Sequence, residues 1–155
     1  MSLNLQQIKA LIPHREPMLL VEEVLEIEPG TYCKAMRQTD ESDFYFQGHF
    51  PGNPIMPGIF LIEAMTQTSA ISAASTLQEP EKFNFYFGGT QKNSFRQPVV
   101  SGDQLILESR LLIQRLSLWV FESVIHVNNV KVAQAEIKLM IFDPSQGVIS
   151  PQKDN

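Results

Sequence analysis

The chain has 155 residues, which is the length of one ordinary domain. Its composition, with 43% hydrophobic and 19% charged residues, excludes a largely disordered protein. Its net charge of −5 argues against a protein that binds nucleic acid through its overall charge. Cys33 is the only cysteine, which excludes an internal disulfide and zinc sites built from several cysteines, and a reducing, cytoplasmic setting is expected. The first residues lack a basic start before an apolar run, and no apolar stretch reaches about 18 residues, so neither a signal peptide nor membrane insertion is expected.

The first forty residues predict a short helix followed by a β-hairpin. The apolar spacing from Asn4 to Ile12 is typical of an amphipathic helix, and Pro13 ends it. Residues 18–27 are rich in Val, Leu and Ile and predict a strand. The turn Pro29-Gly30 then leads into a returning strand over residues 31–39.

Residues 40–58 predict an ordered loop without a regular element. Residues 48–58 read GHFPGNPIMPG, with three glycines and three prolines in eleven residues. Proline fixes φ and glycine lets the backbone approach a ligand closely, so this loop should be stiff.

Residues 59–77 give the clearest helix, because they contain no Gly or Pro and the first half is apolar nearly all round. Such a helix is normally buried in a core. The residues beyond Pro80 predict strands, with a bulge or a break at Gly88-Gly89 and a hairpin turn at Asn128-Asn129. The expected strands and extended segments cover residues 83–87, 95–100, 104–114, 118–127 and 130–142.

This order of elements predicts the α+β class, with a curved antiparallel sheet wrapped around one long central helix. One domain is expected over residues 1–143, followed by a loose C-terminal tail over residues 144–155.

Glu63 is a candidate functional residue because it interrupts the apolar helix. A carboxyl group held away from water keeps its proton more readily, as a general acid must. The alternative is a structural glutamate that is hydrogen-bonded or reaches solvent near the helix start. Gln67 lies four residues further on the same helix face, either orienting Glu63 or simply packing as a buried amide.

His49 lies between two glycines in the stiff loop, either as a general base or as an ordinary turn residue. Gly58, where the helix is about to start, is placed to bring a backbone N–H close to a ligand. A base, an acid and such a donor together suit removal of a proton next to a carbonyl, followed by loss of a leaving group.

Three segments carry a resemblance to a known family. Residues 48–67 read GHFPGNPIMPGIFLIEAMTQ, residues 13–21 read PHREPMLLV, and residues 95–103 read FRQPVVSGD. Over roughly residues 8–142 the chain resembles the FabZ-type 3-hydroxyacyl-acyl carrier protein dehydratases.

The resemblance implies a hotdog fold, an obligate homodimer that often assembles into a hexamer, and no metal or organic cofactor. It implies that His49 removes the α-proton of a 3-hydroxyacyl chain and that Glu63 of another subunit donates a proton to the leaving hydroxyl. The amide of Gly58 would hold the thioester carbonyl. The same motif places further residues beside the substrate: Phe50, Pro57 and Gln67.

The resemblance also implies acyl carrier protein as the partner. Carrier proteins of this kind are acidic, and Lys92 and Arg96 are the candidate docking residues, with ordinary solvated charges as the alternative. Gln97 stands where the family often has a second basic residue, which weakens the expected docking patch. Aspartate is typical of the related dehydratase–isomerases at the position of Glu63, so isomerase activity is not expected.

Two other functions are compatible with the same fold. A thioesterase would need a positioned water and usually places its carboxylate elsewhere. A protein that only binds acyl thioesters would be expected to lack His49 or Glu63, and both are present.

Overall fold

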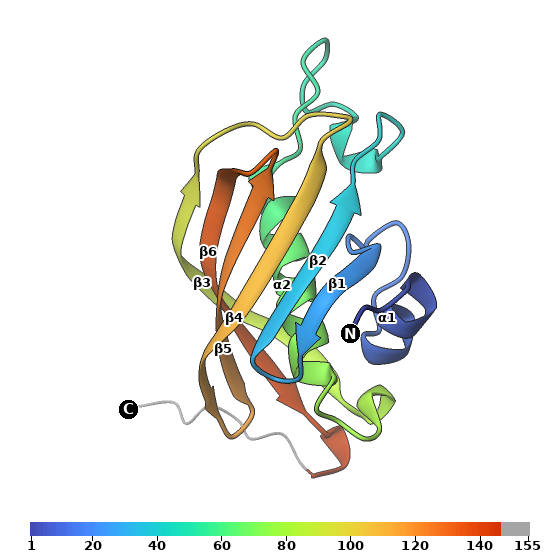
Figure 1. Cartoon of the computed structure of the whole chain (residues 1–155), viewed down its shortest axis with the longest axis vertical. Coiled ribbons are helices and arrows are strands. Elements are labelled where there is room, and N and C mark those ends of the chain that lie inside the picture. Colours follow the sequence, from blue (N-terminus) through green and yellow to red (C-terminus); the bar gives the residue numbers. More distant parts are fainter. Residues whose placement is uncertain (147–155) are drawn as a thin grey trace.

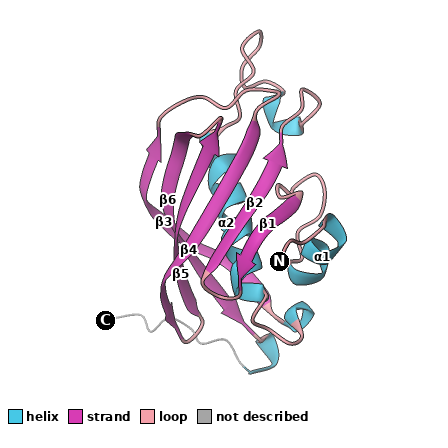
Figure 2. Ribbon diagram, in the orientation of Figure 1, coloured by secondary structure: helices cyan, strands magenta, loops and turns pink. Residues whose placement is uncertain are grey.

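The computed structural model describes residues 1–146 and shows one six-stranded antiparallel sheet curved around a central helix (Figure 1). The strand order is β1-β2-β4-β5-β6-β3. The helices are α1 (Leu5–Leu11) and α2 (Gly58–Ala74), and the strands are β1 (Glu23–Glu28), β2 (Tyr32–Gln38), β3 (Asn84–Phe95), β4 (Gln104–Arg115), β5 (Leu118–Val127) and β6 (Val130–Phe142). This is the predicted α+β hotdog architecture, with short α1 outside the sheet near β1 (Figure 2).

Helix α2 is buried along most of its length because the sheet covers it. All residues from Ala64 to Ala74 are buried, and α2 contacts β2, β4, β5 and β6. Its first turn is different, since the side chain of Ile59 is 69% exposed. Within residues 1–146 no helix is long and apolar enough to cross a membrane.

Three buried hydroxyl groups fix α2 against the sheet. The Oγ atom of Ser69 on α2 lies 3.0 Å from that of Ser109 on β4 and 3.2 Å from that of Ser123 on β5. The two strand hydroxyls lie 2.6 Å apart. Because each group has hydrogen-bonding partners, the core carries these polar atoms without a large desolvation cost.

The predicted bounds of the last two strands are confirmed. β5 and β6 are joined through Asn128 and Asn129, both in the left-handed region with φ of 50° and 63°. This is the backbone that a two-residue hairpin turn requires. The irregularity predicted at Gly88-Gly89 is present as a bulge, because the register shifts between Phe87 and Gly89 while β3 continues to Phe95.

The prediction of a strand over residues 18–27 was wrong in its first half. β1 begins only at Glu23, and residues 19–21 are buried without belonging to a strand. The backbone of this segment is hydrogen-bonded to a side chain of α2 and not to a neighbouring strand. Gln67 Nε2 donates to Met18 O, and Gln67 Oε1 accepts from Leu20 N. The apolar run that suggested a strand therefore packs beside the central helix.

Several smaller expectations also change. Phe44–Phe46 forms a short 3₁₀ turn inside the loop that was expected to lack regular structure, and α2 ends at Ala74 rather than at residue 77. β3 is twelve residues long and absorbs Phe95, the start of the expected segment 95–100. Of the predicted tail, residues 144–146 form a 3₁₀ turn and residues 147–155 lie outside the described residues.

Cys33 is fully buried on β2, and burial raises the pKa of its thiol to about 12. The thiol therefore stays protonated and packs as a small apolar group.

Candidate functional site

His49 lies in a loop held by short-range backbone hydrogen bonds. Ile55 N donates to His49 O at 2.7 Å, and Phe50 and Asn53 exchange two bonds of 2.8 and 2.9 Å. Gly48 and Gly52 have φ of +78° and +75°, a backbone region that other residues seldom adopt. The loop extends beyond the end of the sheet, at the top of Figure 1.

The His49 ring is oriented by the same loop. Its Nδ1 atom lies 2.8 Å from Ile55 O. A carbonyl oxygen only accepts hydrogen bonds, so Nδ1 carries the proton and Nε2 of the neutral ring is left with a free lone pair. The ring of Phe50 stacks on this imidazole at a centroid distance of 4.0 Å. Within residues 1–146, Nε2 of this oriented ring has no hydrogen-bond partner.

A cavity of about 380 Å³ opens beside His49. It is lined by His49, Ile55, Met56, Gly58, Leu61, Phe95, Arg96, Gln97 and Pro98. The predicted residues His49, Gly58 and Arg96 therefore meet at one cavity, although they come from a loop, a helix start and the segment after β3.

Gly58 is the first residue of α2, and its N–H has no hydrogen-bond partner within residues 1–146. Pro57 is the N-cap residue and supplies no side-chain cap. A Cβ atom at position 58 would come within 3.2 Å of Cε1 of Phe95, so glycine keeps this corner of the cavity open. The helix N-terminus presents a free donor to the cavity that holds His49.

Glu63 lies one turn further along α2 and is held by Gln67. Gln67 Nε2 donates to Glu63 Oε1 at 2.8 Å and to Met18 O at 2.7 Å, while Gln67 Oε1 accepts from Leu20 N at 2.7 Å. Gln67 is fully buried and uses both N–H groups and its oxygen. The two interpretations of Gln67 are therefore both correct, since its amide is buried and also contacts Glu63.

Glu63 lines a different cavity, of about 260 Å³, whose other residues are Ile59, Ile62, Thr66, Phe87 and Thr90. The Glu63 side chain is 25% exposed, so the fully buried position suggested by its apolar neighbours is not observed in the single chain. The cavities of His49 and Glu63 share no lining residue. One chain does not bring the predicted acid and base into one cavity.

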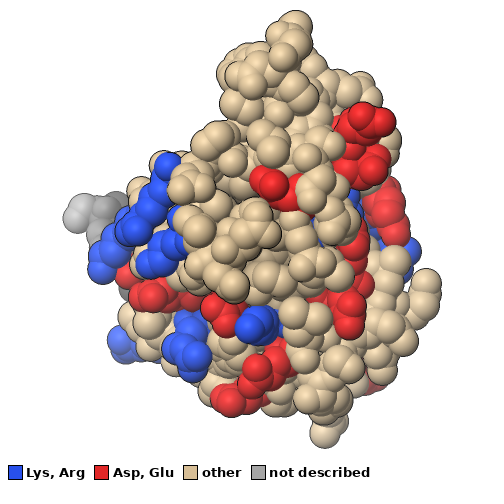
Figure 3. Space-filling view, turned by 45° about the horizontal axis from the view of Figure 1, so that its top comes forward, with Lys and Arg blue, Asp and Glu red and all other residues tan. Residues whose placement is uncertain are grey.

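The two candidate docking residues are in different electrostatic settings. Lys92 Nζ lies 3.0 Å from Glu136 Oε1, so its charge is already paired. Arg96 is exposed at the His49 cavity, and its side chain forms no ion pair within the described part of the chain. In the face shown in Figure 3, the basic side chains gather at one side and are interleaved with acidic ones.

The sequence did not indicate His14 as a neighbour of Glu63. Its Nε2 atom lies 3.5 Å from Glu63 Oε1. The β1–β2 hairpin and the loop after it separate the two residues in sequence, so no local pattern could have related them. Among residues 1–146, no group of three or more His, Cys, Asp or Glu side chains is arranged to hold a metal ion.

Comparison with known proteins gives consistent matches. Residues 12–136 match the family model described as a FabA-like domain. The chain is 43% identical to the 3-hydroxyacyl-[acyl-carrier-protein] dehydratase FabZ of Enterococcus faecalis, over 91% of this chain and 99% of the relative. It is 42% identical to the FabZ dehydratase of Lawsonia intracellularis, over 85% and 88% of the two chains.

Solved structures support the fold. The dehydratase heterocomplex ApeI:P from Xenorhabdus doucetiae matches with a TM-score of 0.77 at 17% identity, over 89% of this chain and 92% of that one. A hypothetical thioesterase with coenzyme A from Streptococcus pneumoniae matches with a TM-score of 0.61 at 11% identity, over 77% and 84%. At these identities the likeness concerns architecture alone, and the site must distinguish the activities.

Proposed function

The chain belongs to the FabA-like family of 3-hydroxyacyl-[acyl-carrier-protein] dehydratases, and on that premise we propose how its own residues remove water from the acyl thioester. The substrate is a 3-hydroxyacyl chain on acyl carrier protein, and the product is the trans-2-enoyl thioester of fatty acid or related acyl synthesis. The observation that carries this assignment is the His49 ring, whose Nδ1 is committed to Ile55 O while Nε2 remains free to accept a proton.

The reaction divides between the two cavities. His49 Nε2 takes the α-proton, and the free N–H of Gly58 stabilises the charge that develops on the thioester oxygen. The electron pair of the broken C–H bond forms the Cα–Cβ double bond as the C–O bond at Cβ breaks. Glu63 gives its proton to the departing hydroxyl, which leaves as water. Phe50 stacks on the base, Pro57 precedes Gly58, and Gln67 holds the acid.

We place the acid and the base of one active site on two subunits. The separate cavities of His49 and Glu63 support this arrangement, as does strand β3, which is an edge of the sheet and exposes Tyr86, Phe87 and Phe95. An edge strand with exposed aromatic residues is a surface for pairing with a second copy. A homodimer joined there would contain two complete sites, and dimers of this kind could assemble into a hexamer.

The carrier protein would dock beside the His49 cavity. Arg96 is the better supported contact because it lines this cavity and forms no ion pair within residues 1–146, whereas Lys92 already lies 3.0 Å from Glu136 Oε1. An acidic carrier would gain from an Arg contact mainly in association rate and at low salt. The cytoplasm, where Cys33 remains reduced, is the compartment that fits this partner.

The first experiment measures reversible hydration of a crotonyl thioester on acyl carrier protein and on coenzyme A. We expect His49→Ala and Glu63→Gln each to lower the rate by roughly 100-fold or more, because each removes a general acid or base. His126→Ala and Glu81→Gln, which change the same residue types away from both cavities, should retain wild-type rates. Thioester cleavage without hydration would support a thioesterase, and no reaction on either carrier would contradict the proposal.

A mixing experiment tests the two-subunit site. His49→Ala and Glu63→Gln proteins, each inactive alone, are unfolded together and refolded as a mixture. Random pairing gives heterodimers with one intact site, so about a quarter of wild-type activity should return. Recovery would be absent if both residues of a site came from one chain.

A further inference from the structure

The two carboxyl oxygens of Glu63 are held unequally. Oε1 accepts a hydrogen bond from Gln67 Nε2 at 2.8 Å and has His14 Nε2 at 3.5 Å. Oε2 has no hydrogen-bond partner within residues 1–146. The protein therefore surrounds one oxygen with nitrogen atoms and leaves the other to the cavity.

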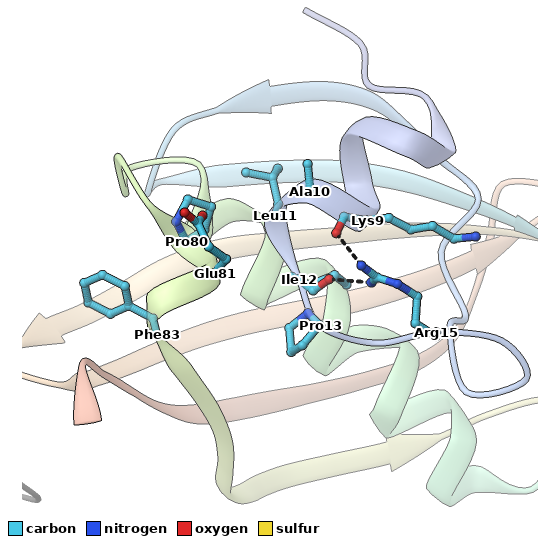
Figure 4. Close-up of a pocket in the computed structure, with 9 residues that line it drawn as sticks. All are labelled: Lys9, Ala10, Leu11, Ile12, Pro13, Arg15, Pro80, Glu81 and Phe83. Carbon is cyan, nitrogen blue, oxygen red and sulfur yellow. Dashed lines mark hydrogen bonds between the residues drawn. The ribbon is translucent and has the colours of Figure 1, made fainter. Parts of the chain in front are cut away.

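His14 is placed by contacts of its own segment, shown in Figure 4 for the neighbouring Arg15. Arg15 Nη1 donates to Ile12 O at 2.9 Å and to His14 O at 2.7 Å, and Nη2 donates to Lys9 O at 2.9 Å. The guanidinium thereby ties the end of α1 to the backbone of His14. Because these bonds fix the backbone, the imidazole is presented to α2 from a rigid support.

The surroundings of His14 also select its protonation state. Nδ1 is buried without a hydrogen-bond partner among residues 1–146, and a buried N–H without an acceptor is rarer than a bare acceptor atom. The single ring proton therefore belongs on Nε2, the atom that faces Glu63. The charged groups around the ring are Glu63 on α2 and Arg15 on its own segment, and burial outweighs Glu63 so that the pKa of His14 is lowered.

We propose that His14 is a positioning residue for Glu63: its neutral Nε2–H and the Gln67 amide together hold Oε1, so that the acid proton resides on Oε2, facing the substrate. This inference rests on the proposed role of Glu63 as the general acid. The 3.5 Å separation is at the outer limit of a hydrogen bond, and catalytic hydrogen bonds often shorten when substrate binds.

The kinetic test compares His14→Phe, which keeps an aromatic ring without the donor, with His14→Gln, which restores a neutral N–H. We expect His14→Phe to lower kcat about five- to tenfold with KM within about twofold, and His14→Gln to stay within about threefold of wild type. A donor to a carboxylate favours its ionised form, so the alkaline limb of the rate profile should move to higher pH in His14→Phe only. Equal losses in both variants with an unchanged pH profile would overturn the proposal.

A measurement without turnover separates this inference from the proposed function. The ring ¹⁵N shifts of His14 at about pH 7 should report a neutral ring with the proton on Nε2, and Glu63→Gln should move the Nε2 signal. The same substitution should leave the His126 signals in place. A His14 ring that is protonated or carries its proton on Nδ1 would overturn the inference even in an active enzyme. An inactive wild type that shows the expected shifts would contradict only the function proposed for the site.

Discussion

The His49 loop and the Glu63 helix turn hold the two proposed catalytic side chains in opposite ways. Around His49 the partners are near in sequence: the ring and the carbonyl oxygen both bond to Ile55. Around Glu63 the local backbone is an ordinary helix, and Gln67 on the next turn is anchored to Met18 and Leu20, which lie 49 and 47 residues away. His14 adds a second distant contact.

This difference separates two ways of fixing a reactive group. A loop rich in Gly and Pro restricts its own backbone, so a short segment specifies the position of His49, the proposed base. A glutamate on a helix still has several rotamers, and a single one is selected only when other segments pack against it. We therefore expect substitutions in the loop to lower the free energy of unfolding through backbone strain. Substitutions around the helix should lower it by leaving buried polar groups without partners.

The largest expected effect tests whether the loop is as self-contained as its hydrogen bonds suggest. Arg37 on β2 lies 2.7 Å from Asp43 Oδ1, and Asp43 Oδ2 accepts a 2.7 Å bond from the Tyr45 hydroxyl. Arg37→Met would leave this half-buried carboxylate unpaired and should cost about 3 kcal/mol of unfolding free energy. Urea denaturation measures the loss, while activity per folded molecule should fall less than about tenfold.

The matched control for that experiment is Lys34→Met on the same strand. Lys34 Nζ lies 3.8 Å from Glu108 in a more exposed pair, so its removal should cost less than about 1 kcal/mol. Similar losses in the two variants would show that the loop receives no special support from Arg37.

The second prediction concerns the helix side. Gln67→Leu leaves Leu20 N and Met18 O without their partner and frees Glu63, so it should lower the unfolding free energy by about 2 kcal/mol and reduce kcat as well. The exposed Gln104→Leu change controls for loss of an amide. A stable Gln67→Leu protein with full activity would remove the basis for the contrast between the two regions.

A third prediction isolates backbone strain in the loop. Gly48 has φ of +78° with nothing within 4 Å of an added Cβ atom, so Gly48→Ala should cost about 1 kcal/mol through conformation alone. Gly48→Asn should cost less, because asparagine tolerates this region better. Thermal unfolding compares the two, and a cost for Asn equal to that for Ala would argue against strain as the cause.

The smallest expected effect is the pH dependence contributed by His14. Its pKa is lowered from 6.5 in the folded protein, chiefly by burial, so the unfolded state binds more protons as the pH falls through 6.5. The stabilisation from a neutral His14 is complete above that value and is lost at lower pH. Between about pH 7 and pH 5 the unfolding free energy of wild type should decrease more steeply than that of His14→Gln. Parallel curves would mean that His14 has the same proton affinity in both states.

Much of the fold follows from local pattern. The apolar run after Gly58 predicted the central helix, the alternation in β5 and β6 gave their bounds, and Asn128-Asn129 predicted the turn between them. The apolar residues 18–21 led to a wrong strand prediction, because hydrophobic side chains indicate that a segment is buried but not which element its backbone bonds to. Its backbone bonds to a glutamine side chain, a contact that no strand pattern contains.

For the site, the sequence by itself determined the residue types and the stiff loop, because Gly and Pro restrict the chain wherever it folds. His49 and Gly58 were predicted as candidate site residues from this loop, and Glu63 from its position in an apolar helix. Only the tertiary structure decided which nitrogen of His49 is free, that His14 and Gln67 surround one oxygen of Glu63, and that the two cavities are separate in a single chain. The physical reason is that hydrogen-bond partners and cavity walls depend on distances between segments remote in sequence, which a local pattern does not encode.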